Sequence, residues 1–387
     1  MWKDELKAAM KRGMEIPLGD HHVELRAHLA SGPIVEALER VGPLSGGAFM
    51  LNSDNGSTGF GPRIVGEKLA KRIIDGGSID GAIDWLERIL ATPHARGIGV
   101  LALWGVEVAA PCELAHGVTI LPFEQLPNGR AKERMLRWDD RSFREPPSAA
   151  LTTAAEIRPL WTPSGQVRDP HDPFALKSKL QDSCLALSIV GPCCPIPAAY
   201  WFEFDNREIN DAALGTSYSI SRDNSYWEVH PTRLDVAKAK STVEAFLDLG
   251  EPLRSKIRLA LGRFNQALRR PPFGDRALDL AIAIESLLVD KGSEINYKIA
   301  LRAALLLGGN LEARLKTRDI VKALYGLRSD LVHNGLLPEK ARMDGAKRHS
   351  VEVVDAASIV CAKVIEAVML QGSVDWERLE LGSLALP

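Results

Sequence analysis

From about residue 233 to residue 375, apolar residues recur at three- and four-residue spacings, which place them on one face of an α-helix. The connections between these apolar segments are short and contain glycine, proline or charged residues, which end helices. Helices with short connections pack antiparallel to their neighbours. The sequence therefore predicts an all-α antiparallel helical bundle. Its helices are expected over 252–268, 276–289 (capped by Asp275), 294–309, 316–335 and 350–370.

The first 232 residues have a mixed pattern. Apolar residues with helical spacing predict helices over 33–41, 62–75 and 78–91. Short apolar and β-branched runs predict strands over 97–108, 117–123, 155–161 and 200–205. Segments 45–62 and 162–173 are rich in turn-forming residues and predict irregular connections. We therefore expect an α+β region over 1–232, of undetermined topology, followed by the helical bundle over 233–375.

Composition and cysteine usage narrow the class of protein. The chain is 45% hydrophobic and 25% charged, which is ordinary for a globular protein. Its five cysteines form no C-x-x-C pair, which argues against a disulfide framework or a structural zinc site. The N-terminus lacks the apolar core of a secretory signal, and the charge-free run 184–202 contains glycine and prolines typical of strand and loop. We expect a cytoplasmic protein with no metal, no cofactor and no membrane segment.

Charge is unevenly distributed along the chain. The formal net charge is −2, yet residues 252–349 contain 19 lysines and arginines against 10 aspartates and glutamates. A basic helical segment in an otherwise acidic chain is typical of a nucleic-acid contact. Two other interpretations stay open: a basic face that only meets solvent, or docking onto the acidic part of the same chain.

The most informative motif is Arg328-Ser-Asp-Leu-Val-His333, followed by Asn334 and Gly335. With 30 arginines and 9 histidines in 387 residues, this spacing is expected about once by chance, so context must decide. The looser pairs Arg88/His94 and Arg342/His349 look accidental, because the first spans a proline and the second lies in what reads as a charged loop. The first motif instead ends a predicted helix inside the basic bundle.

In this context the stretch 252–370 resembles the HEPN superfamily, particularly its Apea-like branch. The resemblance rests on RALDLAIAIESLLVD with Glu285, YKIALRAALLL with Arg302 and LYGLRSDLVHNG with the R-x4-H motif. It implies a metal-independent endoribonuclease that acts in anti-phage defence or as a toxin. Members pair two such domains into a composite cleft, and because this chain has one motif, the resemblance implies a homodimer. RNA and a phage-derived trigger or an antitoxin would be its partners, and the N-terminal region would sense or regulate.

Chemistry gives the motif residues distinct roles under this resemblance. RNA carries its own nucleophile, the 2′-hydroxyl, so the protein needs only to move protons and stabilise charge. His333 would act as general acid or base, since imidazole titrates near neutrality. Arg328 would hold the phosphate. Ser329, Asp330 and Asn334 could orient either group, although the family commonly has Asn at the position of Ser329. Glu285 could pair with Arg328 or with Arg302.

Helix geometry constrains this site. Residues five apart on a straight helix differ in direction by about 140°, so Arg328 and His333 do not share a face. They could converge if the helix ended near His333, or if two copies met across a two-fold axis. The alternative is a purely structural pair of residues at a helix end, in a non-catalytic module for dimerisation or nucleic-acid binding.

Overall fold

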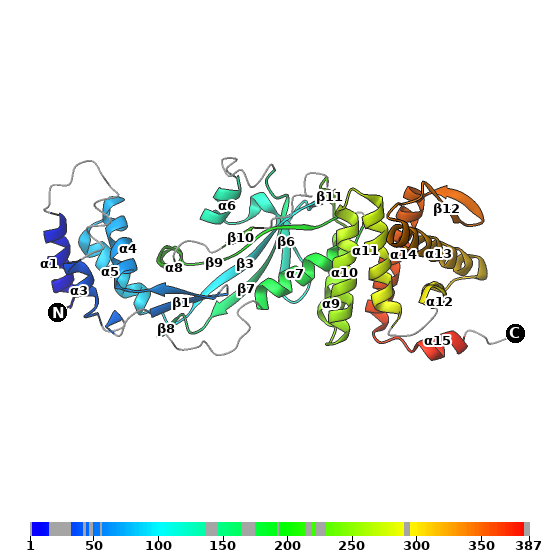
Figure 1. The fold of residues 1–387 in the computed structure, drawn as a ribbon. Coiled ribbons are helices and arrows are strands. Elements are labelled where there is room, and N and C mark those ends of the chain that lie inside the picture. The colour runs from blue at the N-terminus through cyan, green and yellow to red at the C-terminus, as the bar shows by residue number, and fades with distance from the viewer. Residues whose placement is uncertain are drawn as a thin grey trace.

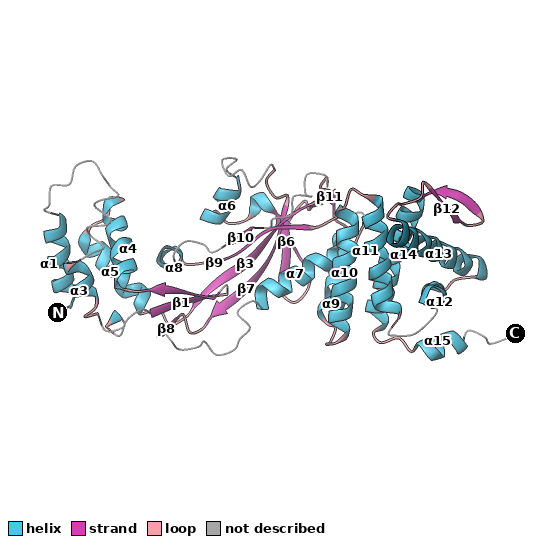
Figure 2. Cartoon of the chain, in the orientation of Figure 1, coloured by secondary structure: helices cyan, strands magenta, loops and turns pink. Residues whose placement is uncertain are grey.

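The computed structural model describes residues 2–14, 32–41, 44–45, 49–54, 56–136, 145–163, 175–191, 193–213, 218–220, 230–289 and 295–382. The molecule is elongated, with N-terminal helices at one end, a β-sheet in the middle and a helical bundle at the other end (Figure 1). Colouring by secondary structure shows that strands concentrate in the N-terminal part and helices in the C-terminal part (Figure 2). The predicted order, an α+β region followed by a helical region, is confirmed at this level.

The N-terminal end is a small helical layer on a three-stranded sheet. Helices α1 (Trp2–Met14), α3 (Pro33–Leu38), α4 (Pro62–Ile74) and α5 (Ile79–Leu90) bury one apolar cluster around Trp85. The last three confirm the predicted helices, and Ser78 caps α5 by accepting a hydrogen bond from the amide of Gly81 at 3.0 Å. These caps and apolar stripes are local signals, which is why the sequence located the helices.

The sequence predicted an irregular connection over 45–62, and this prediction is wrong for the residues of the segment that the structure describes. It contains a hairpin of β1 (Phe49–Ser53) and β2 (Gly56–Phe60), and β1 also pairs with β8 (Trp161–Pro163). The buried Asn52 joins the strands: its amide donates to the carbonyl oxygen of Pro159 at 2.9 Å and its side-chain oxygen accepts from Ser57 at 2.6 Å. Two strands of five residues are too short to show a clear period, and the stabilising partner β8 lies far away in sequence. Within the predicted connection 162–173, residues 164–173 lie outside the described residues.

The central sheet has six antiparallel strands in the order β10-β9-β3-β7-β6-β5. Their bounds are β3 (Ala95–Trp104), β5 (Cys112–Glu113), β6 (Val118–Pro122), β7 (Ala149–Ile157), β9 (Ile196–Phe204) and β10 (Tyr218–Ile220). Val100, Ala102 and Trp104 of β3 face η2 (Phe123–Gln125) and α6 (Arg130–Leu136), whereas Leu101 and Leu103 face the opposite side. Both faces are covered, which explains why β3 is apolar almost throughout.

Two strand predictions need correction. The segment 97–108 is not one strand, because Gly105 adopts a positive φ of 75° between β3 and β4 (Val106–Glu107), and β4 pairs with β11 (Thr232–Arg233) instead. Segment 155–161 is divided between β7 and β8, which belong to different sheets. Both runs are apolar across a change of sheet, so hydrophobic pattern alone does not reveal the break. The predictions over 117–123 and 200–205 correspond to β6 and β9.

A long helix that the sequence did not predict covers the second face of the sheet. Helix α7 (Ala175–Leu187) includes Cys184 to Leu187, so the interpretation of 184–202 as strand and loop is wrong for its first residues. Asp182 and Ser183 are buried in α7 beside apolar residues, and this blurs the amphipathic pattern. α8 (Arg207–Ala212) follows β9 and borders the N-terminal helices.

The C-terminal region is helical as predicted, apart from one hairpin described below. Its helices are α9 (Val236–Leu247), α10 (Leu253–Arg269), α11 (Phe273–Leu288), α12 (Ile295–Leu307), α13 (Leu311–Asn334), α14 (Ser350–Gln371) and α15 (Trp376–Gly382). Asp275 does not cap α11, which begins two residues earlier; it lies in the first turn and pairs with Arg270 at 3.7 Å. Gly308 and Gly335, both with positive φ, end α12 and α13.

Contacts between helices establish their directions. Arg270 pairs with Asp275 and Arg263 with Asp279 at 3.2 Å, so α10 and α11 run antiparallel. Gly274 lies against Leu331, whereas Ala281, further along α11, accepts from Tyr325, so α11 and α13 are antiparallel as well. The antiparallel packing of α10 and α11 follows from the short connection between them, whereas α11 and α13 are not consecutive, so tertiary packing sets their relative direction.

The bundle and the sheet share one continuous hydrophobic core. Leu180 and Leu187 of α7 belong to the same buried cluster as Val243, Phe246 and the bundle helices. Buried polar contacts add to this interface, because Arg258 of α10 binds both carboxylate oxygens of Asp182 at 2.7 and 2.8 Å. Isolating the bundle would therefore expose apolar surface that α7 covers. No helix in the described residues is long and apolar enough to cross a membrane.

Candidate functional site

The motif residues lie in the second half of α13, and local signals define that helix at both ends. The side chain of Asn310 accepts a hydrogen bond from the amide of Ala313 at 2.9 Å, and Gly335 closes the helix at a φ of 69°. Between them, Val321, Leu324 and Leu327 are buried in the bundle. This buried stripe determines which side of the helix faces inward at Arg328.

Arg328 is half-buried, and its guanidinium is only partly satisfied. The Nε atom is inaccessible to solvent and has no hydrogen-bond partner among the described residues. A buried donor without a partner costs about 1–3 kcal/mol, so native structures rarely contain one without a reason. Because Nε is closed to solvent, an anion from solvent can approach this half-buried side chain only at its terminal nitrogens.

Glu285 and Tyr325 form the charged surroundings of Arg328. The hydroxyl of Tyr325, one turn before Arg328, is 3.1 Å from the carbonyl oxygen of Ala281 and 3.3 Å from Oε2 of Glu285. Burial, followed by the negative charge of Glu285, raises the pKa of Tyr325, while the positive charge of Arg328 lowers it. The carboxylate of Glu285 therefore already accepts a hydrogen bond from Tyr325, and it makes no ion pair with Arg328 in the described structure.

His333 lies in the last turn of α13 and is exposed. Its imidazole makes no hydrogen bond or ion pair with any part of the chain that the structure describes. The ring is therefore accessible to a bound molecule or to a second protein chain. Two large apolar residues beside it, Val332 and Leu336, have 56% and 75% of their surface exposed.

One chain does not bring Arg328 and His333 together. α13 is helical through both residues and ends only after Asn334, so the two side chains leave the helix about 140° apart. Arg328 is half-buried, whereas His333 is exposed to solvent. The predicted convergence through an early end of the helix is therefore wrong for one chain, while pairing of two copies and a purely structural role both stay predictions.

The three polar neighbours of the motif differ in placement. Ser329 and Asp330 are half-buried, and Asn334 is exposed at the last position of α13. None of the three side chains has a hydrogen-bond partner within the described ranges. Asp330 borders a groove of about 530 Å³ between α13 and the segment that follows it, where Lys340 and Arg342 also lie. The groove joins the motif helix to these two basic residues on one surface.

The segment around Arg342 and His349 is a β-hairpin, so its interpretation as a charged loop is wrong. Strands β12 (Lys340–Met343) and β13 (Ala346–His349) pair antiparallel, with Arg342 opposite Lys347 and Lys340 opposite His349. Asp344 and Gly345 have positive φ values of 51° and 74°, which fits a two-residue hairpin turn. The Asp-Gly pair between alternating residues is a signal that could have revealed the hairpin.

The hairpin register gathers positive charge on one face. Lys340, Arg342, Lys347 and His349 share a face because alternate residues of a strand point the same way. The opposite face includes the buried Met343, which packs on the bundle core. Like charges directly opposite each other destabilise a strand pair. Arg342 and Lys347 therefore repel each other, and a bound polyanion would reduce this repulsion.

Arg302 contacts α15 and the end of α11 rather than Glu285. Its Nε donates to Glu380 of α15 at 2.6 Å, one of its terminal nitrogens donates to the carbonyl oxygen of Leu288 at 2.6 Å, and its guanidinium lies 5.0 Å from the ring of Trp376. These contacts attach α15 to the ends of α11 and α12. The expected pairing of Glu285 with Arg302 is not among the contacts of the structure, and neither is the pairing with Arg328.

No family model matches this chain, and no curated protein and no solved structure matches it either. Its function is therefore inferred from the placement of its own residues. The relevant observations are the unpartnered Arg328 Nε, the exposed His333 and the basic face of the hairpin.

The described residues contain no group of three or more His, Cys, Asp or Glu side chains placed to hold a metal ion. The five cysteines are free, and all but Cys112 are buried. Burial raises the pKa of the Cys193 thiol to about 12, so it stays protonated and is a poor metal ligand.

Proposed function

We propose that this chain is a HEPN-like endoribonuclease that cleaves RNA without a metal ion, at a site formed by two copies of the chain. The observation that carries the proposal is Arg328 itself, a half-buried arginine on α13 that makes no ion pair among the described residues. Its Nε is closed to solvent, so a phosphate oxygen would bind at the terminal nitrogens, where guanidinium groups form strong charge-assisted hydrogen bonds. The neighbouring hairpin supplies further positive charge for the RNA backbone.

The chemistry needs only acid–base catalysis and charge stabilisation. The 2′-oxygen of RNA attacks the adjacent phosphorus and loses its proton to a base, while the bond from phosphorus to the 5′-oxygen breaks and that oxygen takes up a proton. The products are a 2′,3′-cyclic phosphate and a 5′-hydroxyl. His333 serves one of the two proton transfers, because imidazole can accept or donate near neutral pH. Arg328 stabilises the charge on the non-bridging oxygens.

A homodimer reconciles this chemistry with the geometry of α13. In one chain Arg328 and His333 project about 140° apart, so a single copy cannot present both to one phosphate. If two copies pack around the ends of α13, His333 of one chain can approach Arg328 of the other. The exposed Val332 and Leu336 beside His333 provide apolar surface for such packing.

Regulation and location complete the proposal. The enzyme acts in the cytoplasm, in defence against phage or as a toxin, and its free cysteines suit a reducing compartment. The α+β region restrains it until a phage-derived trigger or an antitoxin changes its state. The continuous core between α7 and the bundle supports this role. A shift of the sheet would move α7, and the contact of Asp182 with Arg258 would transmit that movement to α10.

The decisive experiment incubates the full-length protein with labelled RNA in EDTA. We expect fragments with 2′,3′-cyclic phosphate ends from the wild type, and at least about a hundredfold slower cleavage by Arg328→Ala and His333→Ala. Arg318→Ala on the same helix and His94→Ala, another exposed histidine, are matched controls that should retain activity. A His333→Ala variant that cleaves at the wild-type rate would contradict the proposed site.

Mixing the two inactive variants tests the composite cleft. A mixed dimer of Arg328→Ala and His333→Ala chains contains one site with both residues intact, so about a quarter of wild-type activity should return after exchange of subunits. If the mixture stays inactive while exchange is demonstrated, Arg328 and His333 do not act across a dimer interface.

A non-catalytic role is the second candidate, and the separation of Arg328 from His333 in one chain favours it. In that case the basic face of the hairpin would bind RNA, or the α13 ends would mediate dimerisation, without cleavage. Intact RNA after incubation, together with binding that weakens in a hairpin variant, would support this role over the first.

A further inference from the structure

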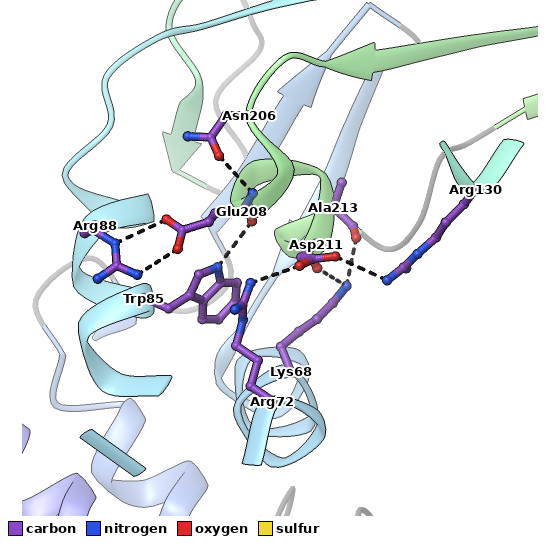
Figure 3. A network of polar contacts seen from close by, with 9 residues as sticks. All are labelled: Lys68, Arg72, Trp85, Arg88, Arg130, Asn206, Glu208, Asp211 and Ala213. Carbon is purple, nitrogen blue, oxygen red and sulfur yellow. Dashed lines mark hydrogen bonds and ion pairs between the residues drawn. The ribbon is translucent and has the colours of Figure 1, made fainter. Parts of the chain in front are cut away.

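A positively charged pocket lies far from the bundle, where the N-terminal helices meet the end of the central sheet. It has a volume of about 500 Å³ and is walled by α4, the loop into α5, the first turn of α5, α8 and the start of α6. Figure 3 shows the side chains of Lys68 and Arg72 extending from α4 toward Asp211 on α8, with Arg130 approaching from the other side. Residues from three separate stretches of sequence therefore converge here.

The side chains of this pocket carry an excess of positive charge. Lys68, Lys71 and Arg72 are spaced three and four residues apart on α4, which places them on one face of the helix, and Arg130 adds a fourth cation. Only two carboxylates, Asp75 and Asp211, line the same pocket. Three cations on one helix face repel one another, so this arrangement is unfavourable without a compensating anion.

Asp211 cannot neutralise all of its cationic neighbours. Its Oδ2 accepts from Arg72 at 3.0 Å and its Oδ1 lies 3.2 Å from a nitrogen of Arg130. Lys68 instead donates to backbone carbonyl oxygens of Asp211 and Ala213, the second at 2.8 Å. One carboxylate is thus shared by two guanidinium groups, while the ammonium of Lys68 meets only neutral acceptors.

The excess positive charge of the pocket also affects the pKa of Lys68. Burial, followed by the positive charge of Arg130, lowers the pKa of Lys68 to about 8, and Lys71 and Arg72 act in the same direction. Asp211 opposes this shift but does not overcome it. Lys71 has neither a hydrogen bond nor an ion pair among the residues that the structure describes. The pocket therefore holds a free ammonium next to one whose proton is easily lost.

The loop between α4 and α5, which borders the pocket, requires glycine at two positions. Gly76 adopts a φ of 98°, and a Cβ on Gly77 would lie 2.6 Å from the carbonyl oxygen of Arg72, so this loop cannot carry ordinary side chains without strain. The loop leads into the N-terminus of α5, whose first amides have no acceptor within the helix. Helix N-termini contribute a partial positive charge that favours phosphate groups.

A second cavity of about 790 Å³ adjoins the first, since Arg130 and Asp211 line both. Its other polar lining includes Asn128, Glu133 and Glu203. Burial raises the pKa of Glu203, and its carboxylate lies so near Gly129 that any side chain there would clash with it. This neighbouring cavity offers hydrogen-bond acceptors, which suit hydroxyl or amino groups rather than a phosphate.

We propose that the cationic pocket binds a phosphorylated small molecule, with its phosphate between Lys68, Lys71 and Arg130 and its donor-rich body in the adjoining cavity. A concave site of this size suits a small ligand better than a nucleic-acid strand. The phosphate is common to nucleotides and sugar phosphates, and both have bodies rich in hydroxyl groups. Such a ligand would connect α4 and α5 to α6 and α8, and its binding does not depend on RNA cleavage.

The test measures ligand binding by the full-length protein, by thermal shift and calorimetry. The probes are inorganic phosphate, a nucleoside monophosphate and a hexose phosphate, with the unphosphorylated nucleoside and hexose alongside them. A phosphorylated probe with a body should raise the melting temperature progressively with concentration and bind more tightly than inorganic phosphate. The tighter of the nucleoside monophosphate and hexose phosphate arms identifies the source of the phosphate.

Variants locate the binding. Lys71→Gln and Arg130→Gln should each weaken binding of that probe about tenfold or more. Arg63→Gln is the matched control on α4, because Arg63 is exposed and its one ion pair within the described residues is with Glu67 at 3.7 Å, and it should leave binding unchanged. Absence of binding by every phosphorylated probe at about 10 mM would overturn the proposal. The proposal would also be overturned if the probe bound the wild type, Lys71→Gln and Arg130→Gln with equal affinity. It would likewise be overturned if the protein bound RNA but none of the phosphorylated small molecules.

Discussion

The hydroxyl of Tyr325 lies 3.3 Å from the carboxylate of Glu285, across the contact between α13 and α11. Tyr325 is buried, and its pKa is raised, so the hydroxyl keeps its proton and continues to donate. Glu285 is the carboxylate that the sequence suggested as a partner for Arg328, and this hydrogen bond engages it with Tyr325 instead. It therefore helps to explain why a half-buried arginine is left with an unpartnered nitrogen.

Removing this hydroxyl should both destabilise the bundle and weaken the site. In Tyr325→Phe, we expect the free energy of unfolding to fall by about 1 kcal/mol, as measured by urea denaturation. Glu285 would then be free to pair with Arg328 and compete with phosphate, so RNA affinity should fall severalfold. Tyr297→Phe on α12, where Tyr297 is 61% exposed, serves as the control and should change neither quantity.

Neutralising the hairpin face should weaken RNA binding in a salt-dependent way. For the double variant Arg342→Gln and Lys347→Gln, we expect the slope of log affinity against log salt concentration to become shallower by about 0.7 for each RNA phosphate that the hairpin no longer neutralises. The hairpin itself should not be destabilised, since the opposed like charges are removed. Lys240→Gln on α9 removes an exposed charge elsewhere, and an equal change in that variant would refute a role for the hairpin.

Charges placed beside His333 should disrupt the dimer without unfolding the chain. Because Val332 and Leu336 are exposed, Val332→Glu with Leu336→Glu should alter the free energy of unfolding by no more than about 0.5 kcal/mol each. Analytical ultracentrifugation should then show monomers, and RNA cleavage should be lost. Leu311→Glu, at the other end of α13 and 72% exposed, is the control that should stay dimeric. A Val332/Leu336 variant that remains a dimer excludes this end of α13 as the interface.

The depressed pKa of Lys68 predicts a pH effect on stability. The lysine titrates at about 8 in the folded chain and near 10.5 when unfolded, so between these values the unfolded state binds more protons. The contribution of Lys68 is therefore complete above pH 10.5 and is lost as the pH falls to about 8. Because the ammonium is partly exposed, we expect only about 1 kcal/mol.

Comparison with Lys68→Met isolates this effect from other titrations. Urea denaturation at about pH 7.5 and pH 10 should show the wild type gaining about 1 kcal/mol relative to the variant. Lys71→Gln, which keeps Lys68 but removes a neighbouring positive charge, should reduce the gain only in part. A constant difference between the wild type and Lys68→Met at both pH values would show that Lys68 titrates normally.

Local sequence signals located much of the secondary structure. Gly335 ends both the predicted helix and α13, and Ser78 begins the predicted helix 78–91 and caps α5, because a cap needs only its own helix. The start of α13 was predicted at residue 316, five residues too late, although Asn310 caps it. The Asp344-Gly345 pair was equally local, yet the charged residues around it concealed the hairpin. The pairing of β1 with β8 was not accessible, since these strands lie over a hundred residues apart and neither is long enough to show a period.

The sequence by itself determined that α13 would end at Gly335 with Arg328 and His333 in its last turns, and that the surrounding segment would be basic. Tertiary structure decided the surroundings of these residues: the Nε of Arg328 is buried without a partner among the described residues, Glu285 contacts Tyr325, and His333 stays exposed. It also brought Lys68, Arg130 and Asp211 into one pocket. The physical reason is range, because caps and periods act within a few residues, whereas burial and charge depend on neighbours that only the folded chain supplies.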